Sequence, residues 1–184
     1  MFCMTTSSSY HLFCCISKSF SDYMLKVDLF GIGIMMFSLV ITCTYGALHA
    51  HHYARNLIIG TMLTIFFSNM LIQSMPCYKR FDNDCVPVLF YVLIASLCFT
   101  VAVSWYFYFA SKEELQLFAG RIGLSWVCLI AGFGFFQTGF PECYFPNSRF
   151  VHLCLQSHIW WHVLTFMNAY MLYWFLFDIL IYSQ

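Results

Sequence analysis

Two histidines in this chain, His158 and His162, stand four residues apart in a long uncharged stretch. On an α-helix this spacing puts both imidazoles on one face, about 6 Å apart along the axis. His11, from another uncharged stretch, would supply a third ligand to a metal held by this pair. Three protein ligands plus water is the pattern of catalytic zinc, and neutral imidazoles suit zinc. The alternative is a set of core histidines that form hydrogen bonds between helices, which the spacing alone also allows.

Two more polar residues accompany the three histidines. Asp28 stands immediately before the uncharged stretch 29–54, where it could bind a metal through water or orient that water. Ser7 is one helical turn from His11 on the same face and could hydrogen-bond the water or a substrate. The alternative role for Asp28 is a helix cap or a partner of the helix dipole, because aspartate is common at helix starts.

Other potential metal ligands fit simpler roles. His49, His51 and His52 cluster beside Arg55, where a solvated loop is expected because loops collect polar residues. The ten cysteines form no C-x-x-C pair, and most lie in apolar runs, where they act as small buried hydrophobes. A disulfide framework and a cysteine zinc ribbon are therefore not predicted.

The elements that carry these residues are predicted to be transmembrane helices. Charged residues make up 9% of the 184 residues and apolar residues 61%, against about 25% and 45–50% in soluble domains. A spanning helix needs about 20 residues with few charges, and a β-barrel would need alternating rather than continuous apolar runs. Six charge-free stretches qualify as candidate spans: 1–17, 29–54, 56–78, 85–111, 122–141 and 150–177. The prediction is one all-α, polytopic transmembrane helix bundle over residues 1–184.

Charge predicts the orientation of this bundle and excludes one class of partner. Five basic residues lie on the side of the connections 18–28, 79–84 and 142–149, and three lie on the other side. The positive-inside rule then places the first side, with all three candidate histidines, toward the cytosol. The formal net charge is zero, so a nucleic-acid partner is not expected.

Three segments carry a resemblance to a known family. The first is SSSYHLFCCIS followed by KVDLFGIGI, which contains Ser7, His11 and Asp28 at the family's spacing. The second is GFPECYFP at 139–146, similar to the family's Pro-Glu-Arg, Phe-Pro turn with a cysteine in place of the basic residue. The third is SHIWWHV at 157–163, similar to Ser-His-x-x-x-His-Val. Together they resemble the progestin and adipoQ receptor family, which includes the adiponectin receptors and is related to haemolysin III.

The resemblance implies a seven-helix membrane protein with zinc on three histidines near the cytosolic face. This chain would correspond to helices two to seven, as an N-terminally truncated bundle, with His11, His158 and His162 as zinc ligands. One implied function is a signalling receptor or adaptor, with membrane lipid, a lipid or hormone ligand and a cytosolic signalling protein as partners. The other is a ceramidase-like, zinc-dependent hydrolase of lipid amides, with Asp28 and Ser7 as catalytic residues.

Overall fold

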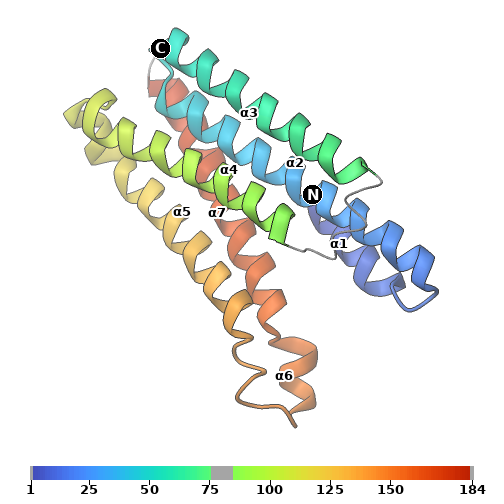
Figure 1. Cartoon of the computed structure of the whole chain (residues 1–184). Coiled ribbons are helices and arrows are strands. Elements are labelled where there is room, and N and C mark those ends of the chain that lie inside the picture. The colour runs from blue at the N-terminus through green and yellow to red at the C-terminus, as the bar shows by residue number, and fades with distance from the viewer. Residues whose placement is uncertain (1, 76–84, 183–184) are drawn as a thin grey trace. The chain divides into compact units, whose positions relative to one another are not determined.

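The computed structural model describes residues 2–75 and 85–182, and every regular element in these ranges is a helix (Figure 1). The chain separates into two compact units, Met1–Phe109 and Ala110–Gln184, which are described one at a time. The connection 79–84, on which part of the predicted orientation rests, lies outside the described residues. The prediction of a single domain over 1–184 stays a prediction.

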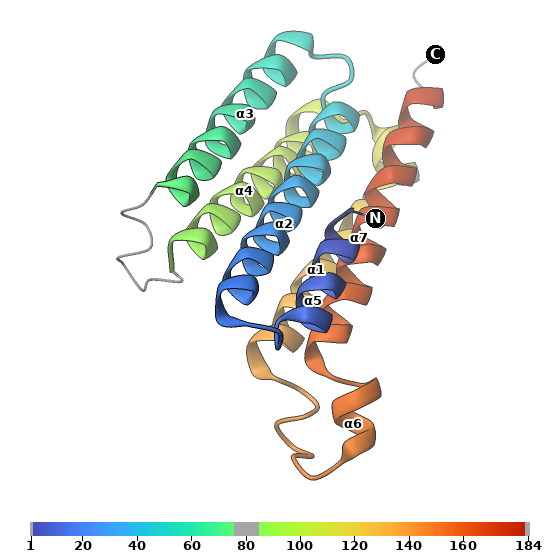
Figure 2. The same ribbon diagram turned by 90° about the vertical axis from the view of Figure 1, so that its right-hand side faces the viewer.

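The first unit is built around one long helix. Its elements are α1 (Phe2–Phe13), α2 (Lys18–Ala47), α3 (His52–Ser74), α4 (Cys85–Ser104) and the π-helical turn η2 (Trp105–Phe109). The long helix α2 packs against α1, α3 and α4, and Figure 2 shows α1 beside the first part of α2.

Local chemistry explains where α2 begins and how closely α1 approaches it. Ser17 caps the helix by accepting a hydrogen bond from the Phe20 backbone N–H at 3.3 Å. At Gly31 the two helices come so close that an added Cβ would lie 3.3 Å from the Cα of Cys3 and would collide with the Thr6 side chain. A glycine at this position therefore allows the tight α1–α2 contact.

The second unit consists of α5 (Lys112–Thr138), the short α6 (Arg149–Cys154) and α7 (Ser157–Tyr182). A capping box between Ser111 and Glu114 starts α5, and Gly139 ends it with a left-handed φ of 60°. Helices α5 and α7 pack along each other, and α6 lies at the end where they are connected (Figure 2). Their close approach falls at Gly132, where an added Cβ would lie 3.2 Å from the Cβ of Leu164.

Five segments of the described chain are long and apolar enough to cross a membrane, so the protein is an integral multi-pass membrane protein. They are Lys18–Ala47, His52–Ile72, Leu89–Phe109, Lys112–Thr138 and Arg149–Tyr182. The predicted all-α membrane fold is confirmed. The count of six spans is not confirmed, because the stretch 1–17 contains α1, a helix of 12 residues.

Candidate metal centre

The predicted histidine pair meets on α7. His158 and His162 are the second and sixth residues of this helix, both are half-buried, and their Nε2 atoms lie 3.0 Å apart. Two nitrogens bound to one tetrahedral zinc at its usual bond length lie about 3.3 Å apart. The pair therefore fits two ligands of one zinc with a shift of a few tenths of an ångström. The same distance also fits a hydrogen bond from one neutral imidazole to the other.

Aromatic rings of α5 hold the first turns of α7. The ring of Phe136 lies 5.8 Å from those of both His158 and Trp161, and Phe135 stacks on Trp160 at 5.6 Å. The two tryptophans thus pack against α5 within the second unit. This packing limits rotation of α7 and fixes the direction in which its histidines point.

A carboxylate from the connecting loop binds the start of α7. The Ser157 backbone N–H donates to Glu142 Oε2 at 2.7 Å, and the Ser157 hydroxyl donates to the other carboxylate oxygen. Burial acts to raise the pKa of the Glu142 carboxyl, but the hydrogen bonds from Ser157 hold that pKa below its usual value. The sequence showed this glutamate only as part of the GFPECYFP motif, because its partner is 15 residues away.

The first unit brings Ser7, His11 and Asp28 together. The Ser7 side chain forms a hydrogen bond with the Asp28 carboxyl, and His11 is close enough to interact with it electrostatically. Both Ser7 and Asp28 are buried, with 2% and 7% of their surface exposed. Next to Asp28, the carbonyl of Leu29 accepts a hydrogen bond from the Tyr91 hydroxyl at 2.9 Å, which ties α4 to this part of α2.

Asp28 is not a helix cap, so the alternative role considered from the sequence is wrong. It lies about three turns inside α2, whose N-cap is Ser17. Its Oδ1 atom is buried and has no hydrogen-bond partner among the described residues. A buried carboxylate oxygen without a donor is costly. The Asp28 carboxylate is therefore buried in the interior of α2 with one oxygen that receives no hydrogen bond from the described residues.

Within the described residues, no three metal-ligating side chains gather into one group. The structure places the histidine pair in the second unit and the Ser7, His11 and Asp28 set in the first. The donor atoms of each set suit a zinc centre: the histidine pair has converging imidazole nitrogens, and the other set has a buried carboxylate oxygen without a hydrogen-bond partner among the described residues. The meeting of the two sets stays a prediction from the sequence.

The remaining histidine cluster agrees with the loop interpretation. His51 is exposed in the connection between α2 and α3, and His52 is exposed as the first residue of α3, whereas His49 is half-buried with its Nδ1 atom 3.1 Å from the Gly46 carbonyl. His52 Nδ1 lies 2.8 Å from the Arg55 guanidinium, and the His51 ring packs 4.6 Å from Phe109. These contacts fold the loop onto its own unit.

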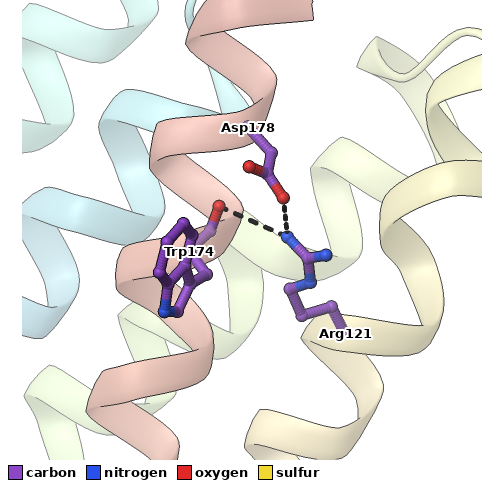
Figure 3. Close-up of polar contacts among 3 residues, drawn as sticks. All are labelled: Arg121, Trp174 and Asp178. Atoms are coloured by element: carbon purple, nitrogen blue, oxygen red, sulfur yellow. Dashed lines mark hydrogen bonds and ion pairs between the residues drawn. The ribbon is translucent and has the colours of Figure 1, made fainter.

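The second unit also contains an ion pair that the sequence did not predict. Arg121 on α5 pairs with Asp178 on α7, and the same guanidinium donates to the Trp174 carbonyl at 3.3 Å (Figure 3). Asp178 thereby neutralises a cation on the neighbouring helix, which lowers the cost of placing either charge in the span.

Comparison with known proteins identifies the family. The sequence profile described as haemolysin-III related matches residues 1–173, almost the entire chain. The chain belongs to this family. The resemblance found in the three motifs is thereby confirmed, and the motif-bearing residues Ser7, His11, Asp28, His158 and His162 all lie within the match.

Two curated relatives of this haemolysin-III-related protein agree with the family assignment. It is 26% identical over 175 residues to the mouse protein "Progestin and adipoQ receptor family member 3" and 24% identical to the human protein of the same name. In both cases the match covers 94% of this chain and 55% of the relative. The chain thus spans about half the length of these relatives.

Proposed function

We propose that this chain is a zinc-containing membrane receptor or adaptor of the haemolysin-III-related family, with His11, His158 and His162 as the zinc ligands. The observation that carries the proposal is the convergence of the His158 and His162 Nε2 atoms at 3.0 Å. The names of the mouse and human relatives support the receptor function. A membrane lipid or hormone would be its ligand, and a cytosolic signalling protein its partner.

In this function the chain uses the metal to hold helices together. The histidine pair contributes ligands from α7, and His11 contributes the third from α1. The aromatic packing between α5 and α7 keeps the pair's imidazoles in one direction. A ligand that shifts one of these helices would change the geometry of the site, which is how a signal could pass along the chain.

A second function is favoured by the buried Asp28 Oδ1 atom, which has no hydrogen-bond partner among the described residues. A proton acceptor needs a carboxylate oxygen that no other donor already binds, and Ser7 orients the Asp28 carboxylate through its hydrogen bond. Zinc, when bound, supplies a Lewis acid that makes water a better nucleophile near neutral pH. The chain would then be a ceramidase-like hydrolase of lipid amides, with Asp28 taking the proton at Oδ1 and Ser7 holding the carboxylate in place.

Lipid release by the purified chain in lipid nanodiscs separates the two functions. The assay follows fatty-acid release from a fluorescent ceramide, before and after zinc removal with a chelator. Release that is lost with the chelator and restored by zinc supports the hydrolase. A chain that holds zinc and releases nothing supports the receptor or adaptor. A chain that binds no zinc contradicts both.

A further inference from the structure

We infer that Glu142 is a positioning residue for the histidine pair: its carboxylate closes the loop onto the first turn of α7 and thereby fixes His158 relative to His162. The inference deepens the proposed zinc site and rests on it. The feature that carries it is the pair of hydrogen bonds from Ser157, whose backbone N–H lies 2.7 Å from Glu142 Oε2 and whose hydroxyl binds the other oxygen.

The start of α7 needs an external partner. The first backbone N–H groups of any helix have no acceptor within the helix, and a negative charge there is favourable. The first turn of α7 contains no acidic residue, and Ser157 is buried, with 6% of its surface exposed. Glu142 supplies both the acceptor and the charge from outside the helix.

The loop that carries Glu142 is held by its own contacts. The Cys143 backbone N–H donates to the Gly139 carbonyl at 2.8 Å, which folds the chain directly after α5. On the other side of the loop, Ser148 caps α6, and His152 Nε2 lies 3.0 Å from the Pro146 carbonyl. Glu142 therefore approaches α7 from a defined position and links the end of α5 to the start of α7.

The consequence for the histidines follows from their places in the helix. His158 is the next residue after Ser157 and belongs to the first turn, whereas His162 lies one turn further in and is held by regular helical bonds. If the first turn frays, His158 moves and His162 does not. Loss of Glu142 should therefore disturb the distance between the two Nε2 atoms, even while the rest of α7 stays folded.

A purely structural cap is the competing explanation, and the test needs a readout that such a cap would not change. Purified wild type, Glu142→Ala and Glu142→Gln are compared, with Glu113→Ala as a matched control, because Glu113 is exposed in the first turn of α5. The readouts are zinc affinity by chelator competition, the d–d absorption spectrum of the cobalt-substituted chain, and amide hydrogen exchange over 157–163. Glu142→Gln keeps the shape of the side chain and one acceptor oxygen, so it provides a folded variant.

We expect Glu142→Ala to weaken zinc binding by about tenfold or more, the usual effect of losing a group that orients a ligand. The cobalt spectrum of Glu142→Ala should also change, and its amide hydrogen exchange over 157–163 should be faster. In all three readouts Glu142→Gln should lie between Glu142→Ala and the wild type, and Glu113→Ala should match the wild type. Faster exchange with unchanged zinc affinity and cobalt spectrum would show a simple cap and overturn the inference, as would no change in any readout. A wild-type chain that binds no zinc would overturn the proposed function and the inference together, whereas a zinc-binding wild type with an unaffected Glu142→Ala variant overturns the inference alone.

Discussion

Replacing Asp28 with Asn tests whether this buried carboxylate performs chemistry. The variant keeps the volume of the side chain and an oxygen that can bind Ser7, but it removes the charge. The new amide N–H would have no acceptor at the position of Oδ1, which costs about 1–3 kcal/mol. Against this, removing a buried charge that is poorly compensated returns a free energy of similar size. The thermal unfolding midpoint should therefore stay near that of the wild type.

Catalysis should respond differently from stability. A lost general base typically slows a reaction by about 100-fold or more, a rise in the barrier of about 2.7 kcal/mol. The assay is ceramide hydrolysis by the purified chain at equal zinc occupancy, with Asp22→Asn as the control, because Asp22 is exposed on the same helix. Wild-type hydrolysis in Asp28→Asn at equal zinc occupancy would refute the catalytic role. Absence of hydrolysis in the wild type would refute it as well and leave the receptor or adaptor.

Three further predictions concern the helices that carry the site. Gly31→Ala should destabilise the chain by about 1–3 kcal/mol, because the added methyl group overpacks the contact with α1. Gly60→Ala is the control and should be neutral or stabilising, because an added Cβ there meets nothing within 4 Å. Thermal unfolding midpoints of the two variants that shift in the same direction would contradict this prediction. Asp178→Asn should cost about 1–3 kcal/mol, because it leaves the Arg121 charge without its partner in the span. A double-mutant cycle with Arg121→Met should show coupling rather than additivity. A tag after Gln184 should resist protease added to the cytosolic side of sealed vesicles, and its cleavage would reverse the predicted orientation.

The sequence predicted the helices well because hydrophobicity decides what can enter a bilayer, but it misplaced several helix ends. A charge-free stretch marks the part of a helix that lies in the hydrocarbon core of the bilayer, whereas the helix itself can continue beyond that core. Helix α2 begins at Lys18, not near residue 29, and α7 continues past Asp178 to Tyr182. Long basic side chains can reach the interface from inside a helix, so a charge does not end it. Because α2 begins ten residues before Asp28, this residue lies in the helix interior and not at the helix start that the sequence predicted.

The parts of the site that follow local periodicity were predictable, and those that depend on distant partners were not. The spacing of His158 and His162 was sufficient to predict their contact, because residues four apart share a helix face. The bond between Glu142 and Ser157 joins residues 15 apart, so it needs the folded loop and leaves no local pattern. The same holds for Arg121 and Asp178, which are 57 residues apart.

Zinc content is the most direct test of the account. The chain is purified in zinc-containing buffer without chelators, and metal per chain is measured by mass spectrometry for the wild type and the His11→Ala, His158→Ala, His162→Ala triple variant. Three imidazole ligands predict about one zinc per wild-type chain and none in the folded triple variant. A wild-type chain without zinc, or full zinc retention in the triple variant, would contradict the account.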